Sequence, residues 1–282
     1  HDYMNEYQNA INDYNITSKQ DIQNVIDAVN GLIAAIIDWT EDNISALEKV
    51  KNNLRVSAFK TTVSKYVNVL KNDRNAMNTF DDGALNSANS TIDSLDNSHY
   101  KELINPSQNA LNKLLSAKID LNKASKDDAQ TAIDKMAKSK VKEEMIAKWQ
   151  ELQLDYLNSH LDEANISALS DLGIKNLNPD YEQDYLDALK QYAEDKGATL
   201  SKEDIQLVID VINAYNKANT IKDNGSVKEA QNLIKSLVEG KLKETLSKDM
   251  STLYNALNPY IPTKDDYLKY VQKNPAIVTA SD

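Results

Sequence analysis

Residue types that carry metal or nucleophilic chemistry are scarce in this chain of 282 residues. Histidine occurs at His1, His99 and His160, and cysteine is absent. Glu163 follows His160 on an expected helix, but the HExxH spacing of a helical zinc site is missing. Without cysteine, thiolate metal sites, disulfides and a cysteine nucleophile are excluded. No GxSxG segment supports a nucleophilic serine either. We therefore predict no catalytic residues, no metal site and no cofactor.

Paired carboxylates are the next candidates for chemistry. They occur at Asp81-Asp82, Asp127-Asp128, Glu203-Asp204 and Asp265-Asp266. None of them has the spacing of a calcium-binding EF-hand loop with its central glycine and closing glutamate. Carboxylates of this kind commonly cap helices or lie on solvated helix faces, which is the role we expect here. A weak calcium site near Asp81 and Asp82 is the alternative.

Tyrosine is the abundant aromatic residue, with 14 copies against two phenylalanines and two tryptophans. Tyrosines near the N-terminus recur at helical spacing in a second segment, where Tyr7 corresponds to Tyr185, so we expect these to pack in a core. A further group near the C-terminus is equally open to core packing and to stacking on a sugar or a protein partner. The candidate contact residues of that group are Tyr254, Tyr260, Tyr267 and Tyr270.

The elements that position these side chains come from internal repeats. Ser18 to Asn30 (SKQDIQNVIDAVN) recurs as Ser201 to Asn213 (SKEDIQLVIDVIN), with nine of thirteen residues identical. The serine and the aspartate three residues later form the pattern of a helix N-terminal capping box. The apolar residues that follow recur at helical spacing and predict one buried stripe. In the first copy that stripe comprises Ile22, Val25, Ile26 and Val29.

A second repeat occurs four times. It consists of an apolar residue, a small residue three positions later, another apolar residue two positions after that, and then lysine. The small residues are Ser57, Ser98, Ser139 and Gly240, and the first three are 41 residues apart. Amphipathic stripes on both sides predict a helix hairpin with the small residue at its turn, and a period near 41 is typical of helical repeats. No segment shows the sustained alternation of a β-strand.

Three breaks complete the expected organisation. Asn105-Pro106-Ser107 is expected to start a helix, Asp223 to Ser226 to form a turn that ends in a cap, and the tail from Thr263 to form one short helix. The sequence therefore predicts an all-α, elongated array of consecutive helix bundles. The expected segments are 1–72, 73–165 and 166–262, followed by a C-terminal tail, 263–282.

Charge and hydropathy restrict the partners. The formal net charge of −11 argues against nucleic acid and anionic membranes, which require clusters of lysine and arginine. The longest apolar run, Leu32 to Ile37, is too short to span a bilayer. No signal peptide is present. The chain begins in the middle of a helical repeat, so we expect a fragment or a processed form.

The repeats resemble helical spacer modules of Gram-positive bacterial surface and S-layer-type proteins. The resemblance rests on Ala168 to Asn213 and on the hairpin pattern Ala230, Ile234, Leu237, Leu242 and Lys243, and together these repeats cover most of residues 3–257. It implies an extracellular location at the bacterial cell surface, with other surface-protein domains or cell-wall polymer as partners. The S-layer-homology motif and the LPxTG sorting signal of anchored proteins are absent from the sequence.

We therefore expect a non-enzymatic structural or adhesive segment, a spacer or self-association module. One alternative is an α-helical pore-forming toxin, for which Gly31 to Trp39 is the sole candidate membrane-active segment. A buried helix interior is the favoured interpretation of that segment because it is so short. The other alternative is a module that binds cell-wall polymer or carbohydrate through the C-terminal tyrosines.

Overall fold

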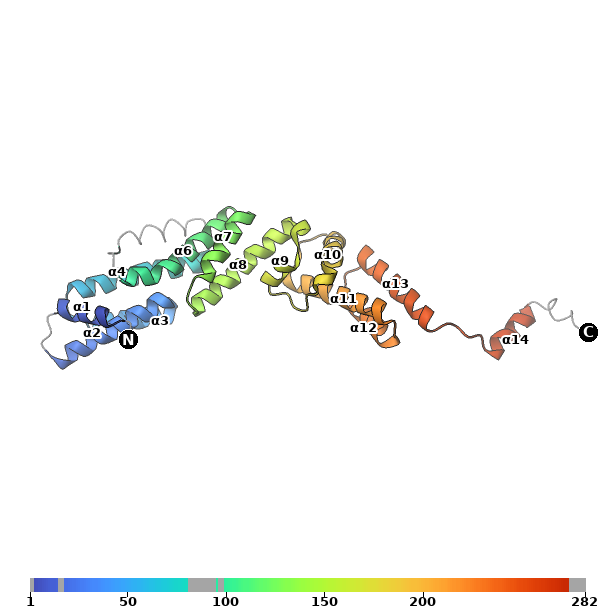
Figure 1. Cartoon of the computed structure of the whole chain (residues 1–282), viewed down its shortest axis with the longest axis horizontal. Helices are drawn as coiled ribbons and strands as arrows, with labels where there is room; N and C mark the ends of the chain where they lie inside the picture. The colour runs from blue at the N-terminus through green and yellow to red at the C-terminus, as the bar shows by residue number, and fades with distance from the viewer. Residues whose placement is uncertain (1–2, 15–17, 81–94, 96–98, 274–282) are drawn as a thin grey trace, which may run out of the picture. The chain divides into compact units, whose positions relative to one another are not determined.

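The computed structural model describes residues 3–14, 18–80, 95 and 99–273. Within these residues it contains 13 α-helices and no strand, which confirms the all-α prediction of an array of helix bundles (Figure 1). The chain divides into two compact units, His1–Ser159 and His160–Asp282, each described by itself below. The expected boundary between residues 72 and 73 falls inside a helix, so the first two expected segments share that element.

Within the described residues the N-terminal unit consists of seven α-helices. Its α-helices are α1 (Met4–Asp13), α2 (Lys19–Ile37), α3 (Glu41–Asn52), α4 (Ala58–Thr79), α6 (His99–Ile119), α7 (Lys123–Asp134) and α8 (Lys140–Ser159).

The C-terminal unit begins with short helical turns and ends with a helix that follows an extended link. Its elements are η1 (Leu161–Glu163), α9 (Ile166–Asp171), η2 (Pro179–Tyr181), α10 (Glu182–Lys196), α11 (Lys202–Ile221), α12 (Asn224–Ile234), α13 (Lys241–Leu257) and α14 (Lys264–Lys273).

The same four-helix arrangement occurs once in each unit. In the N-terminal unit α1 packs on α2, α2 on α3 and α3 on α4, and α4 returns to contact α1 and α2. In the C-terminal unit α10, α11, α12 and α13 follow the same order, and α13 returns to α10 and α11. We call these arrangements module A (α1–α4) and module C (α10–α13). The duplicated sequences therefore adopt equivalent folds.

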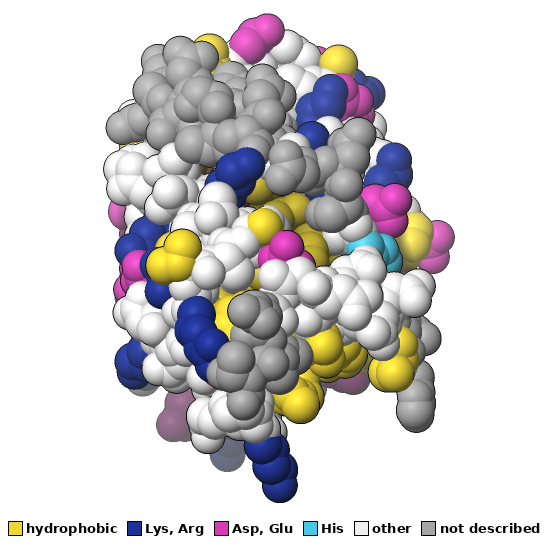
Figure 2. All heavy atoms as spheres, turned by 90° about the vertical axis from the view of Figure 1, so that its left-hand side faces the viewer, with side chains coloured by type: hydrophobic (Ala, Val, Ile, Leu, Met, Phe, Trp, Pro, Cys, Tyr) yellow, Lys and Arg dark blue, Asp and Glu magenta, His cyan; other side chains and the backbone are white. Residues whose placement is uncertain are grey.

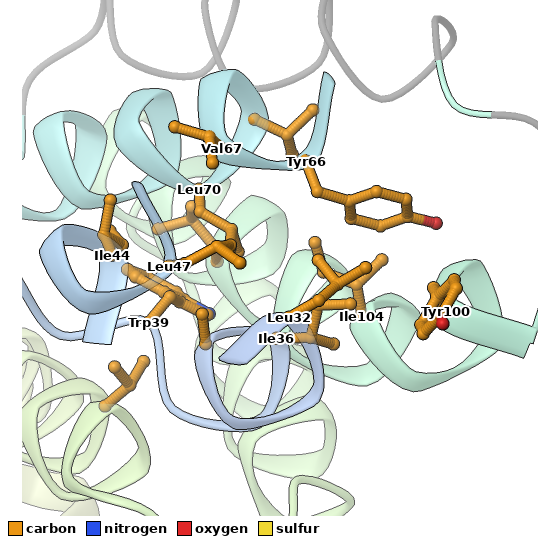
Figure 3. Close-up of a cluster of buried hydrophobic side chains, with 14 of the residues drawn as sticks. Leu32, Ile36, Trp39, Ile44, Leu47, Tyr66, Val67, Leu70, Tyr100 and Ile104 are labelled. Carbon is orange, nitrogen blue, oxygen red and sulfur yellow. The ribbon is translucent and has the colours of Figure 1, made fainter. Parts of the chain in front are cut away.

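The core of the N-terminal unit forms where α2 is covered from several sides. Leu32 and Ile36 of α2 are fully buried, and Figure 3 shows them beside Ile104 of α6. Trp39, just after α2, is also fully buried. Burial of one such leucine or isoleucine stabilises the fold by about 2 kcal/mol. Most apolar side chains of Gly31 to Trp39 thus lie in the protein core, although Ala34 is exposed. Among the helices that the structure describes, none combines the length and the hydropathy of a membrane span.

The two copies of the long helix diverge where their surroundings differ. The second half of α2 is apolar because α6 packs on it in addition to α3 and α4. In module C the corresponding helix α11 packs against α10, α12 and α13, and its second half is polar. Leu32, Ile33 and Ile36 are replaced there by Tyr215, Asn216 and Asn219.

Three local predictions need correction. Pro106 lies inside α6, which starts earlier, at His99, because Tyr100 and Ile104 before the proline pack in the core. The hydroxyl of Ser107 donates to the Ile104 carbonyl beside this proline, at 2.9 Å.

The second correction concerns the start of α12. The cap of α12 is Asp223, whose carboxylate accepts a hydrogen bond from the backbone N–H of Ser226 at 2.7 Å, so the helix begins before the serine.

The third correction concerns the apolar stripe of the first long helix. Ile22 is 38% exposed, whereas its counterpart Ile205 is buried. In the C-terminal unit the side chain of Gln206 bonds both backbone groups of Lys175, so the segment that follows α9 lies over the start of α11. That segment supplies the cover for Ile205.

Both predicted helix starts are confirmed. Ser18 accepts a hydrogen bond from the Asp21 backbone N–H, and Ser201 accepts one from the Asp204 N–H, each at 3.2 Å. In module C the box is reciprocal, since the Asp204 carboxylate accepts from the Ser201 N–H at 2.7 Å. A basic side chain pairs with each aspartate, Arg55 with Asp21 and Lys196 with Asp204. A cap of this kind is worth about 1 kcal/mol.

Candidate functional site

The lysine of the four-copy repeat closes the turn of its hairpin. Its ammonium group donates to the backbone carbonyl of the buried apolar residue six positions earlier. In the three copies whose preceding helix is described, this residue follows the end of that helix by two or three positions. This hydrogen bond is charge-assisted and places a cation where helix carbonyls are unpaired. It occurs in all four copies: Lys60 with Leu54 at 2.7 Å, Lys101 with Leu95 at 3.3 Å, Lys142 with Met136 at 2.9 Å and Lys243 with Leu237 at 3.0 Å.

The small residue of the repeat marks the start of the second helix of the hairpin. Ser57 and Ser139 accept hydrogen bonds from backbone N–H groups three residues later. Gly240 occupies the same place before α13, where a Cβ atom would come within 2.4 Å of Asp195. The predicted turns at these three positions are therefore confirmed, and Ser98 lies outside the described residues.

An aspartate from a distant helix caps three of these second helices. Its carboxylate accepts a hydrogen bond from the backbone N–H two residues after the small residue, which satisfies a free donor of the first turn. Sequence reasoning missed these aspartates, because the repeat pattern does not include them. The pairs are Asp13 with Phe59 at 2.7 Å, Asp38 with Val141 at 3.0 Å and Asp195 with Leu242 at 2.8 Å.

The repeated tyrosines tie the first helix of each module to the second. The Tyr185 hydroxyl donates to Asn213 at 2.5 Å, and Tyr7 donates to Asn30 in module A. Each asparagine is the last residue of its thirteen-residue repeat. Tyr185 is fully buried, as expected for a core residue, and its burial raises the pKa of the phenol. Tyr7 is half-buried against the hydrophobic core.

The four C-terminal tyrosines are divided between two helices and their link. Tyr254 lies on α13 and is half-buried, while Tyr260 follows that helix and is 72% exposed. Tyr267 and Tyr270 lie on α14 and are 68% and 58% exposed. Three of the four tyrosines are therefore more than half exposed.

The carboxylates at this end of the chain act as a local cap. The Asp266 carboxylate accepts from the Thr263 hydroxyl at 2.6 Å and from its backbone N–H at 3.0 Å. These bonds and one from Tyr260 lower the pKa of Asp266, and the same carboxylate raises the pKa of the Tyr260 phenol.

The remaining candidates for chemistry do not converge. His99 contacts Glu102 at 3.2 Å on the exposed start of α6. Asp127 and Asp128 pair with lysines of the same unit. Among the residues that the structure describes, no group of three or more histidine, aspartate or glutamate side chains is arranged to hold a metal ion. The calcium alternative at Asp81 and Asp82 lies outside the described residues.

Two hollows lie at the same place in the two modules. One has a volume of about 410 Å³ between α1 and α4, with the start of α6 at its side, and the other about 330 Å³ between α10, α11 and α13. Part of their walls corresponds in the aligned repeats. The pairs are Glu6 with Asp184, Asn9 with Asp187, Ala10 with Ala188, Phe59 with Leu242 and Thr62 with Thr245.

No family model matches the chain, and neither the curated proteins nor the solved structures compared with it gave a match.

Proposed function

We propose that this chain is a non-enzymatic structural or adhesive segment of a bacterial cell-surface or S-layer-type protein. It acts outside the cell as a helical spacer or self-association module. Its partners are other surface-protein domains or cell-wall polymer.

The observation that carries the proposal is the structural role of the repeated residues. The residues that recur between copies close turns, cap helices or join neighbouring helices. Lys60 and Lys243 bond carbonyls, Ser201 caps a helix, and Tyr185 bonds Asn213. A repeat that keeps its packing residues is typical of an array whose length and surface carry the function.

Self-association tests the spacer role. Sedimentation velocity of the full chain over a range of concentrations, together with co-sedimentation with purified Gram-positive cell walls, measures both kinds of partner. The proposal expects assembly or wall binding by the folded chain. A chain that stays monomeric and does not bind cell walls contradicts it.

The wall-binding alternative is favoured by the exposed tyrosines. Aromatic side chains that stack on a sugar lose most of their contact area when they are replaced by alanine. Tyr260→Ala and Tyr267→Ala are therefore expected to weaken co-sedimentation about tenfold or more. Gln272→Ala, also exposed on α14, is the matched control. Equal binding by all variants excludes the tyrosines as the contact.

The pore-forming alternative has its own measurement. Release of a trapped dye from liposomes at low protein concentration supports a toxin and contradicts the spacer proposal. The proposal expects no release, because the candidate segment Gly31 to Trp39 is packed in the core of its unit.

A further inference from the structure

Two residues that line the hollow of module A each carry a buried polar atom without a hydrogen-bond partner among the described residues. Glu6 is 9% exposed, and its Oε2 atom is buried with no hydrogen bond among the described residues. Tyr100 is 8% exposed, and its hydroxyl is likewise buried and unpaired. Both side chains line the same hollow. Buried polar atoms nearly always have a hydrogen-bond partner. Two unpaired polar atoms on residues that line one hollow therefore point to a ligand that bonds them.

The surroundings define what that partner must offer. The carboxylate needs a donor, while the phenol accepts or donates. The apolar wall includes Ala10, Phe59 and Leu95, and the ring of Tyr66 lies edge-on to that of Tyr100 with 6.0 Å between centroids. Burial and the charge of Glu6 raise the pKa of the Tyr100 phenol, so it stays neutral. Figure 2 shows hydrophobic side chains between charged and polar ones at one end of the N-terminal unit.

In the equivalent hollow of module C, none of the lining residues carries a buried unpaired polar atom, within the part of the chain that the structure describes. Asp184, which corresponds to Glu6, accepts a hydrogen bond from Asn216 at 2.7 Å. Asp249 replaces Tyr66 in the aligned repeats and accepts from the Tyr215 hydroxyl at 3.0 Å. The shared architecture therefore does not require an unpaired carboxylate, and the unpaired oxygen of Glu6 distinguishes module A from module C.

We propose that the hollow between α1, α4 and α6 binds a protonated primary amine on an aliphatic stem, with its ammonium group on Glu6 and Tyr100 and its stem against Phe59. An ammonium group supplies three donors and a compensating positive charge. Aromatic faces add attraction for a cation at this site. A free alkylamine and a lysine side chain of a peptide share this chemistry. The inference is independent of the spacer role.

Calorimetric titration of the full chain at neutral pH tests the site. The probes are n-pentylamine as the free amine, Nα-acetyl-lysine methylamide as the peptide-borne amine, and 1-pentanol as the neutral analogue. We expect saturable binding of at least one amine at one site per chain, and binding of 1-pentanol weaker by about tenfold or more, as for the loss of a charge-assisted hydrogen bond. The amine that binds more tightly identifies the source.

Variants separate this site from general attraction of cations to an acidic protein. Glu6→Gln and Tyr100→Phe should each weaken amine binding about tenfold or more, whereas Asp184→Asn in the equivalent hollow should leave it unchanged. Far-UV circular dichroism checks that each variant stays helical, and Glu6→Asp serves as a second, charge-preserving variant that should retain binding. Absence of saturable binding, equal binding of 1-pentanol, or unchanged binding by Glu6→Gln overturns the proposal, and water then fills the hollow.

Discussion

Asp73 on α4 is fully buried, and its substitution by asparagine should stabilise the N-terminal unit at neutral pH. Its Oδ2 atom accepts a hydrogen bond from the Gln108 side chain on α6, while Oδ1 of Asp73 and Oε1 of Gln108 have no hydrogen-bond partner among the residues that the structure describes. Burial raises the pKa of Asp73 well above its ordinary value, against the smaller opposite effect of the Gln108 hydrogen bond. The neighbouring Arg74 bonds Glu144 and Asn78 instead.

The direction of the pH dependence follows from this pKa. A carboxyl group whose pKa is higher in the folded state than in the unfolded state binds its proton more tightly when folded. Its favourable contribution is complete below the unfolded pKa of about 3.9 and is lost as the pH rises towards the folded pKa. Within that window the free energy of unfolding falls by about 1.4 kcal/mol per pH unit. From pH 4 to pH 7 the loss is at most about 4 kcal/mol.

The Asp73→Asn variant has no proton to lose, and its amide offers both a donor and an acceptor to Gln108. We expect the free energy of unfolding of the variant to equal that of the wild type near pH 4 and to exceed it at pH 7. Urea unfolding followed by tryptophan fluorescence reports on this unit alone, because Trp39 and Trp149 are the chain's two tryptophans and both lie in it. Asp155→Asn, at an exposed position on α8, is the control. A wild type whose stability relative to Asp73→Asn stays constant from pH 4 to pH 7 refutes the reasoning.

Two further predictions concern module C. Gly240→Ala should lower the free energy of unfolding of the C-terminal unit by about 1–3 kcal/mol. The new Cβ displaces the Asp195 side chain and breaks its hydrogen bond to the Leu242 N–H. Gly225→Ala, where the nearest atom is 3.3 Å away, should have a smaller effect, and equal effects contradict the argument. Ser201→Ala should cost about 1 kcal/mol and increase hydrogen exchange in the first turn of α11, while Ser251→Ala should not affect that turn. Unchanged exchange there after Ser201→Ala refutes the role of the cap.

The hairpins could be predicted from the sequence because their signals are local. The stripe of apolar residues, the small residue and the serine caps each act within a few positions along the chain. Pro106 was misplaced for the opposite reason. Local preference puts proline in the first turn of a helix, but the burial of Tyr100 and Ile104 extends α6 on its N-terminal side. Tertiary packing thus overrides a local preference at this one position.

The partners across helices could not be predicted in the same way. The lysine of the repeat was visible in the sequence, but its role depends on the path of the chain through the turn. Asp13, Asp38 and Asp195 cap helices that are 46, 103 and 47 residues away. Nothing in a single sequence marks contacts over such separations. The unpaired oxygen of Glu6 follows from its burial in the folded chain, and the paired counterpart Asp184 shows that the shared fold does not require it.

The central claim is that equivalent residues of the two duplicated modules stabilise equivalent parts of the fold. The most direct test uses the turns that Lys60 and Lys243 stabilise by hydrogen bonds to backbone carbonyls. Hydrogen exchange, measured by mass spectrometry on full-length Lys60→Met and Lys243→Met variants, reports on each turn separately. We expect Lys60→Met to increase exchange at the turn between α3 and α4, and Lys243→Met to do the same, to a similar extent, between α12 and α13. Increased exchange in one module alone, or in neither, contradicts the claim.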